Sequence, residues 1–263
     1  MKLNNQVSLE RTEVWEFDSE YCNAAYKVKT YVPDSEQPIE GFPFIIVLDG
    51  HAYFQIARET VLLQCRNSPK TLVEPSIVIS IEFVGEDKDI RLRRFYDFTP
   101  PAKEYKYPDR LSGANIGEHG GAENFLNMLE FELIPSIEDK FCVDTSKKSI
   151  YGHSLGGLFI LYVLFKHDNL FHSYLAISPS IWWNDCEILL YADKWLGAKD
   201  DFKKPALFMA VGSEEGFMVE NTSRFYEKCK DQLKLDYYLS TGENHASVVP
   251  STISRAFRFM SSS

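Results

Sequence analysis

A serine between glycines is the clearest candidate for chemistry in this 263-residue sequence. Ser154 lies in Gly152-His153-Ser154-Leu155-Gly156, where a short β-type run meets an apolar helical pattern that continues to about His167. This is the arrangement of a nucleophile elbow, in which a strained strand-to-helix turn exposes the serine hydroxyl and small flanking residues keep Cβ atoms out of the crowded turn. We therefore predict that Ser154 is a nucleophile.

A serine hydroxyl reacts only when a base takes its proton, and a third group must hold that base. The histidines after Ser154 are His167, His172 and His245, and only His245 lies in a loop directly past the carboxyl end of a predicted strand. We predict His245 as the base. His167 is expected to end a helix and His172 to be a core or surface residue. His153 is too close in sequence to reach its neighbour's hydroxyl, so we expect it to serve packing.

Two adjacent carboxylates, Glu214 and Glu215, follow the predicted strand 206–211. In a hydrolase of this layout the acid comes between the serine and the histidine in the chain, so either glutamate could orient His245. Glu215 lies three residues past Gly212, which leaves room for a tight turn toward the histidine loop. We prefer Glu215, with Glu214 as the alternative.

Backbone N–H groups must stabilise the oxyanion of an acyl-transfer reaction. The predicted donors are Leu155, directly after the nucleophile, and His51, directly after the Leu-Asp-Gly that ends the first buried strand. Tyr53, Trp182 and Trp183 are predicted in loops at the same end of the sheet, where they would line a pocket for an apolar or aromatic acyl group. The alternative for the adjacent tryptophans is a place in the core.

The elements that must position these residues follow from the apolar pattern. Apolar runs predict strands at 44–48, 76–83, 148–151, 174–177, 206–211 and 236–239, after an antiparallel start at 13–17 and 26–32. Helical spacing occurs at 53–64, 123–140, 155–167, 187–196, 221–235 and 248–260. This alternation predicts a single α/β domain over 1–263, with a mostly parallel central sheet and helices on both faces. Periodicity disappears at 85–121, which predicts a long irregular loop and a candidate cover for the pocket.

Composition excludes several classes of function. The formal charge of -10 arises from 38 acidic and 28 basic residues without a Lys/Arg block, which argues against nucleic acid or an anionic membrane as partner. Five scattered cysteines without C-x-x-C spacing indicate neither a disulfide framework nor a zinc site. The first 17 residues lack the apolar run of a secretory signal, and no apolar run approaches the length of a membrane span. We expect a cytoplasmic protein without cofactor or metal, unless a precursor segment was removed.

Seven segments of this chain, in order, are similar to a known family. They are PFIIVLDGHAYF, RRFYDFTP, GGAENFLNMLEFELIPSIE, GHSLGGLF, SPSIWWND, VGSEEG and ENHASVVP. Together they resemble the putative-esterase family of α/β-hydrolases, and most closely its siderophore-esterase-like branch, which includes the salmochelin and enterobactin esterase types. The resemblance covers about 28–260. It implies the α/β-hydrolase fold and ester hydrolysis through an acyl-serine, with Ser154 as nucleophile, His245 as base and the His51 amide at the oxyanion.

The combined prediction is a serine carboxylesterase acting on a small-molecule ester, either a siderophore or an aromatic or short acyl ester. Acyl transfer or thioester hydrolysis on the same triad is one alternative, and a non-catalytic ligand-binding protein is another. A triscatecholate siderophore is bulky and anionic, and the basic patch it needs is offered by Arg91, Arg93 and Arg94. Arg94 is therefore a candidate substrate-binding residue. Alternatively these arginines pair with nearby acids, namely Glu86, Asp87, Asp89 and Asp97.

Overall fold

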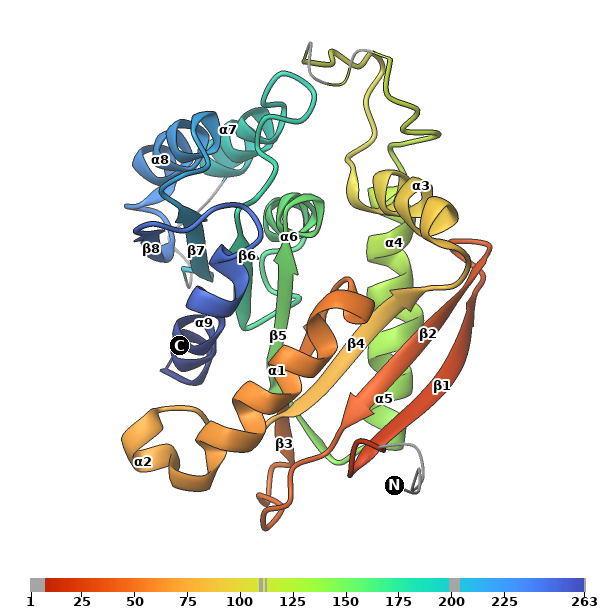
Figure 1. Ribbon diagram of the computed structural model, residues 1–263, viewed down its shortest axis with the longest axis vertical. Helices are drawn as coiled ribbons and strands as arrows, with labels where there is room; N and C mark the ends of the chain where they lie inside the picture. Colours follow the sequence, from red (N-terminus) through yellow and green to blue (C-terminus); the bar gives the residue numbers. More distant parts are fainter. Residues whose placement is uncertain (1–7, 109–110, 112, 199–203, 263) are drawn as a thin grey trace, which may run out of the picture.

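The computed structural model describes residues 8–108, 111, 113–198 and 204–262. Within these residues an eight-stranded sheet forms the centre of the molecule, in the spatial order β1-β2-β4-β3-β5-β6-β7-β8 (Figure 1). In chain order the strands are β1 (Thr12–Ser19), β2 (Ala24–Tyr31), β3 (Phe42–Val47), β4 (Ile77–Phe83), β5 (Val143–His153), β6 (Ser173–Ile177), β7 (Ala206–Gly212) and β8 (Lys234–Ser240). Strand β2 is antiparallel to β1 and β4, and all other pairs are parallel. The predicted mostly parallel sheet is confirmed.

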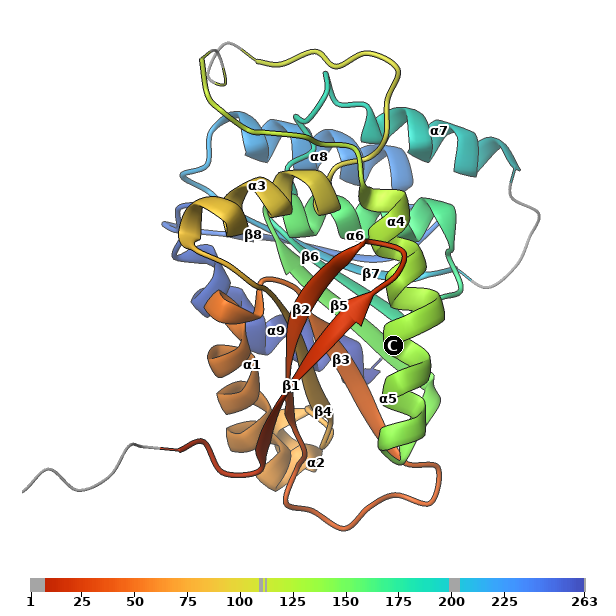
Figure 2. The ribbon, with the colours of Figure 1, turned by 90° about the vertical axis from the view of Figure 1, so that its right-hand side faces the viewer.

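Helices cover both faces of this sheet. They are α1 (Gly50–Gln64), α2 (Ser68–Thr71), α3 (Asp87–Phe98), α4 (Ala122–Met128), α5 (Ile134–Lys140), α6 (Leu155–Lys166), α7 (Ile188–Ala198), α8 (Phe217–Cys229) and α9 (Val248–Ser262). Helices α1 and α9 lie on one face, and α4, α5 and α6 lie on the other (Figure 2). The chain therefore has a helix layer, a sheet and a second helix layer.

The central strands bury side chains on both faces. In β3, Phe44 and Ile46 belong to the core under α4 and α6, whereas Ile45 and Val47 belong to the core under α1 and α9. All four side chains are fully buried. A strand covered on both faces must be apolar at every position rather than at alternate ones. This is why the sequence reads as a continuous apolar run there.

Helices α4 and α5 form the one long helix that the periodicity predicts, joined by a π-helical turn at Leu129–Leu133. Pro135 has no N–H to donate to the carbonyl four residues earlier, and the wider turn accommodates that loss. The carboxylate of Glu132, in the π turn, accepts hydrogen bonds from Ser19 Oγ at 2.6 Å and from the Glu20 N–H at 2.9 Å. The turn between β1 and β2 is thereby tied to the helix layer.

The predicted irregular loop at 85–121 is wrong over its first part, where α3 forms. Two arginines interrupt its apolar pattern: Arg93 donates to Asp97 at 2.8 Å, and the half-buried Arg94 forms an ion pair with the buried Asp49. Helix α3 thus packs partly through ion-paired arginines. A search for apolar residues at helical spacing therefore does not detect this helix. From position 99 to 121 the described residues are largely irregular, and 109–110 and 112 lie outside the described part.

Residues 1–7, the start of the segment interpreted as lacking a secretory signal, also lie outside the described part. Of the helices that are described, none combines the length and apolar character needed to cross a membrane. Among the same described residues there is no cluster of three or more His, Cys, Asp or Glu side chains that could hold a metal ion. All five cysteines are free thiols.

Candidate active site

Ser154 occupies a strained turn between β5 and α6. Its backbone angles are φ 60° and ψ -116°, a region that non-glycine residues rarely adopt, and its N–H donates to the Ile177 carbonyl at 3.0 Å. A Cβ at Gly152 would lie 2.7 Å from the carbonyl carbon of Gly156, so only glycine fits there. The strand, the turn and the helix start therefore hold the Ser154 hydroxyl at the carboxyl edge of the sheet.

His245 lies in the loop between β8 and α9, and Asn244 shapes that loop. The Asn244 side-chain oxygen accepts hydrogen bonds from the N–H groups of Ala246 at 2.9 Å and Ser247 at 3.2 Å. This turn leads into α9 and directs the imidazole toward the elbow, where His245 Nε2 is 3.0 Å from Ser154 Oγ. The distance is that of a hydrogen bond through which a proton can pass.

Glu215 holds the other nitrogen of the imidazole. Its Oε2 is 2.5 Å from His245 Nδ1, while its Oε1 accepts from Ser178 Oγ at 2.5 Å and from the Gly212 N–H at 2.7 Å. Burial alone would raise the pKa of Glu215, but the hydrogen bonds from His245, Ser178 and Gly212 outweigh it and lower that pKa. The carboxylate therefore stays ionised at neutral pH and stabilises a positive charge on His245.

The two adjacent glutamates have different surroundings. Glu215 is 9% exposed and contacts the imidazole, whereas Glu214 is exposed and accepts a hydrogen bond from the neighbouring Ser213. The loops after β7 and β8 approach so closely that a Cβ at Gly212 would lie 2.3 Å from the Glu243 carbonyl oxygen. The structure thus brings Glu215, and not Glu214, to His245.

The His51 amide is positioned by the turn that ends β3. Asp49 has left-handed backbone angles (φ 54°), and both its carboxylate oxygens accept from Arg94, at 2.6 and 2.8 Å. A Cβ at Gly50 would lie 2.5 Å from the Ser80 side chain, so only glycine fits at this position. His51 and Leu155 each lie in the first turn of a helix, where N–H groups have no acceptor within the helix. Both amides can therefore donate to a ligand.

Replacing His51 by proline tests the amide directly. Proline is tolerated in the first turn of a helix, and the preceding glycine has no Cβ to clash with the ring, so α1 should persist while one donor is lost. We expect kcat on a p-nitrophenyl ester to fall by about 100-fold to 1000-fold. Steady-state kinetics on folded protein measure the effect.

The matched control is His51→Ala, which keeps the N–H and removes only an exposed imidazole. It should keep kcat within about threefold of the wild type, because losing an exposed side chain changes little. Equal losses in the two variants would show that the side chain, not the amide, matters.

Two of the four predicted substrate-binding residues lie at Ser154. Tyr53 and Arg94 line a pocket of about 260 Å³ together with Asp49, His51, Ala52, His153, Ser154 and His245. Tyr53 comes from α1 rather than from a loop, which corrects its predicted position. The residues that line this pocket do not include Trp182 or Trp183, and Trp183 is only 1% exposed. For Trp183 the core alternative is the observed one.

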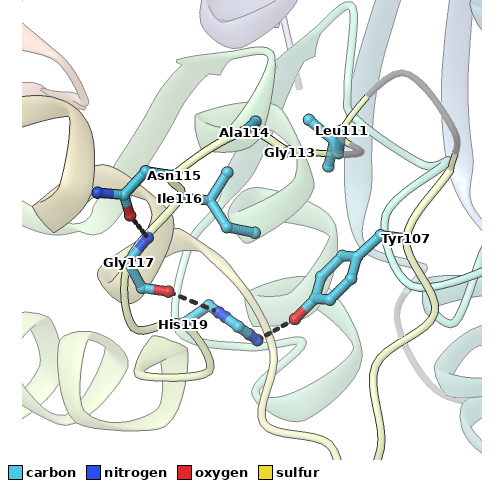
Figure 3. Close-up of a pocket in the computed structure, with 8 residues that line it drawn as sticks. All are labelled: Tyr107, Leu111, Gly113, Ala114, Asn115, Ile116, Gly117 and His119. Atoms are coloured by element: carbon cyan, nitrogen blue, oxygen red, sulfur yellow. Dashed lines mark hydrogen bonds between the residues drawn. The ribbon is translucent and has the colours of Figure 1, made fainter.

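A larger hollow of about 550 Å³ is lined by Tyr107, Leu111, residues 113–117 and His119 (Figure 3). Its walls include Tyr107, whose hydroxyl bonds to His119 Nε2, and Ile116, whose side chain points between them. The ring of Trp183 packs against Tyr107 at 5.8 Å and against His119 at 5.7 Å. Trp183 therefore packs against two residues that line this second pocket and does not line the first.

Sequence reasoning missed two serines of the site. Ser178 donates to Glu215, and the Ser180 hydroxyl is 3.3 Å from that of Ser154. Both lie in the loop after strand β6, whose neighbour β5 carries the elbow. Their position after the carboxyl end of a predicted strand is the signal that could have identified them.

The sequence around this site matches a known protein family. Residues 19–252, which include the elbow, both acidic candidates and His245, match the family described as "Putative esterase". The chain belongs to this family. As a member it is an ester hydrolase, and the resemblance noted from its seven segments is confirmed.

Several individual proteins are similar to this esterase over nearly its whole length. It is 34% identical over 265 residues to Ferri-bacillibactin esterase BesA of Bacillus subtilis, covering 97% of this chain and 91% of that protein. The crystal structure of the BES protein from Bacillus cereus superposes with a TM-score of 0.91 at 36% identity, over 98% of this chain and 99% of that chain. Siderophore hydrolase EstA from Aspergillus nidulans gives 0.84 at 25% identity, over 99% of both chains. These likenesses confirm the α/β-hydrolase fold.

Proposed function

We propose that this esterase hydrolyses ester bonds of a siderophore through an acyl-serine formed on Ser154. The observation that carries the proposal is the unbroken hydrogen-bonded series from Glu215 to His245 to Ser154, with distances of 2.5 and 3.0 Å. An acid, a base and a nucleophile in this geometry activate a hydroxyl that is otherwise a poor nucleophile.

The proposed reaction has two half-reactions, acylation and deacylation of Ser154. Ser154 Oγ attacks the ester carbonyl carbon while its proton passes to His245 Nε2, and the amides of His51 and Leu155 stabilise the oxyanion. The C–O bond to the alcohol then breaks, and His245 returns the proton to the leaving oxygen. Water next attacks the acyl-serine, giving its proton to His245, and the acid leaves as Ser154 regains its hydrogen. Glu215 holds the imidazolium during both half-reactions.

Water, rather than an alcohol, is the favoured acceptor of the acyl group. The His245 side chain is 45% exposed, so solvent reaches the nitrogen that must activate the second nucleophile. A transferase needs a site that keeps water from the acyl-enzyme. This exposure supports hydrolysis over acyl transfer.

The substrate class rests on the relatives and on the second pocket. By their names, relatives of this chain act on ferri-bacillibactin in Bacillus subtilis and on the siderophore enterobactin in Emericella nidulans. The 550 Å³ pocket suits one arm of such a bulky molecule. Trp183 connects this pocket to the site, because its ring packs on Tyr107 at 5.8 Å and its N–H donates to the Ser180 carbonyl at 3.0 Å. Residues at both places would then contact one large ester.

Hydrolysis of a set of esters by one preparation tests the proposal. The set comprises a p-nitrophenyl butyrate, a feruloyl ester, S-formylglutathione and ferric and iron-free triester siderophores, with products separated by liquid chromatography and mass spectrometry. We expect kcat/KM to be highest for a siderophore. Preference for a feruloyl ester or for S-formylglutathione would contradict the substrate class while leaving the triad intact.

Replacing Tyr107 by alanine tests the second pocket. Loss of one aromatic wall should lower kcat/KM for the siderophore about tenfold, through KM, and leave p-nitrophenyl butyrate unchanged. Tyr21→Ala is the matched control, because Tyr21 is 45% exposed and Tyr107 is 43% exposed, and Tyr21 packs on Phe131, away from the pocket. Equal effects of Tyr107→Ala on both substrates would assign Tyr107 to folding.

A further inference from the structure

The imidazole of His153 lies directly against that of His245. The two ring centroids are 4.4 Å apart with 42° between the planes, and His153 is only 6% exposed. On its other side, His153 Nδ1 is 2.8 Å from the Tyr53 hydroxyl, and the Tyr53 ring packs edge-on at 5.7 Å. Tyr53 itself packs on Tyr151 at 6.4 Å. A continuous stack of rings thus extends from the core to His245.

The hydrogen bond between Tyr53 and His153 joins two neutral groups. Burial, and next the Asp49 carboxylate, raise the pKa of Tyr53 to about 12, so its hydroxyl stays protonated. Burial, and next the nearby His245, lower the pKa of His153 to about 3, so this imidazole is neutral. The phenol and Nδ1 therefore share a hydrogen bond in which either can be the donor, according to the tautomer of His153, while Nε2 has no hydrogen-bond partner among the described residues.

A neutral His153 suits the charge cycle of its neighbour. The charged or titratable groups that face it are Tyr53 from α1, Arg94 from α3, and Glu215 and His245 from the loops after β7 and β8. When His245 carries the proton of Ser154, a second cation in the stack would oppose it. A ring that stays neutral can contact both forms of His245 without charge repulsion.

Hydrogen bonds alone leave the His245 imidazole free to rotate at one stage of the reaction, so a packing contact must also hold it. Its side chain is 45% exposed, and two bonds hold it, one to Glu215 and one to Ser154. Once Ser154 is acylated, its oxygen has no hydrogen to donate to Nε2, and only the Glu215 bond remains. Contact with His153 is what then restricts rotation of the imidazole while it activates water.

We infer that His153, anchored by the Tyr53 hydroxyl, is a positioning residue that supports His245 as a flat ring, above all during deacylation. Tyr53 thereby acts through His153, and the substrate-binding role predicted for it is not needed to explain its place in the pocket. The inference adds to the proposed triad and depends on it.

The test compares two double variants that both remove the polar pair. Tyr53→Phe/His153→Phe keeps a planar ring against His245, whereas Tyr53→Phe/His153→Leu fills the space without one. Replacing both hydrogen-bonding partners by apolar groups avoids an unpaired buried polar atom, so both variants should fold. We expect the phenylalanine variant to keep kcat within about fivefold of the wild type and the leucine variant to lose about 10-fold to 100-fold in kcat. Because slower deacylation lowers kcat and KM together, KM of the leucine variant should fall in parallel and kcat/KM should change less than about threefold in both variants.

A second readout separates positioning from simple folding. With a p-nitrophenyl ester, the leucine variant should release a burst of nitrophenol and accumulate acyl-enzyme, detectable by intact-mass spectrometry, because deacylation is slowed most. Tyr151→Phe is the control, since it removes a hydroxyl from the same stack outside the pocket, and it should behave as the wild type.

Three outcomes would overturn the inference. One is a phenylalanine variant as slow as the leucine variant, which would mean that His153 carries protons instead of giving support. Another is a leucine variant with undiminished kcat, and the third is a slowed leucine variant without accumulated acyl-enzyme. Failure of the triad itself is distinguishable, because then Ser154→Ala would remain active.

Discussion

Replacing Ser154 by alanine is expected to lower kcat by about a millionfold, the loss seen when a protease of this chemistry loses its serine. The reason is that alanine removes the hydroxyl that lies 3.0 Å from His245 Nε2 and forms the acyl-enzyme. Hydrolysis of p-nitrophenyl butyrate by purified protein measures the change. A residual rate well above that of water is expected, because the oxyanion donors and the pocket remain.

The nearby Ser180 supplies the control for this experiment. Its hydroxyl is 3.3 Å from that of Ser154 but makes no hydrogen bond to His245 within the described part of the chain, so Ser180→Ala should lose less than about tenfold. An organophosphonate should add its mass to wild-type protein and to Ser180→Ala, and not to Ser154→Ala. Undiminished esterase activity in Ser154→Ala would contradict the assignment, and absence of labelling in the wild type would favour a binding protein.

Replacing Glu215 by glutamine should reduce kcat by about 10,000-fold, as amide substitution of the triad acid does in a serine protease. Glutamine keeps the shape of the side chain but loses the charge that stabilises the imidazolium, and it allows the wrong tautomer of His245. Because hydrogen bonds lower the pKa of Glu215, the wild-type carboxylate stays charged as the pH falls to its ordinary titration range near 4.3. The loss in the variant should therefore be present throughout neutral and mildly acidic pH.

Glu214→Gln is the matched control, because it makes the same chemical change one residue earlier at an exposed position. It should leave kcat within about twofold of the wild type. Comparable losses in the two variants would mean that the negative charge of the loop matters, rather than the hydrogen bond to His245. A loss confined to Glu214→Gln would reverse the assignment of the acid.

Much of the fold could be predicted because strands buried on both faces appear in the sequence as uninterrupted apolar runs. Phe44, Ile45, Ile46 and Val47 are apolar without interruption, and a strand covered on both faces allows nothing else. The order of nucleophile, acid and base along the chain then limited the candidates for each position.

The features that the sequence could not predict depend on contacts between residues that are far apart in the chain. Arg94 gives α3 a polar appearance until its partner Asp49, 45 positions earlier, is known. Tyr53 and His153 are separated by 100 positions, and nothing in either local sequence shows that one anchors the other. Such partners are set by tertiary packing, which local patterns do not record.

The order of strands in the sheet has a consequence for the accuracy of the site. Five adjacent parallel strands, β3, β5, β6, β7 and β8, are each followed by a residue of the site, in the sequence His51, Ser154, Ser178, Glu215 and His245. A slip of one residue in any pair of these strands would shift a group by about 3.3 Å, more than the length of a hydrogen bond. The hydrogen bonds between the strands therefore set the distances between the active-site groups. The active site depends on every one of these strands pairing in the correct register.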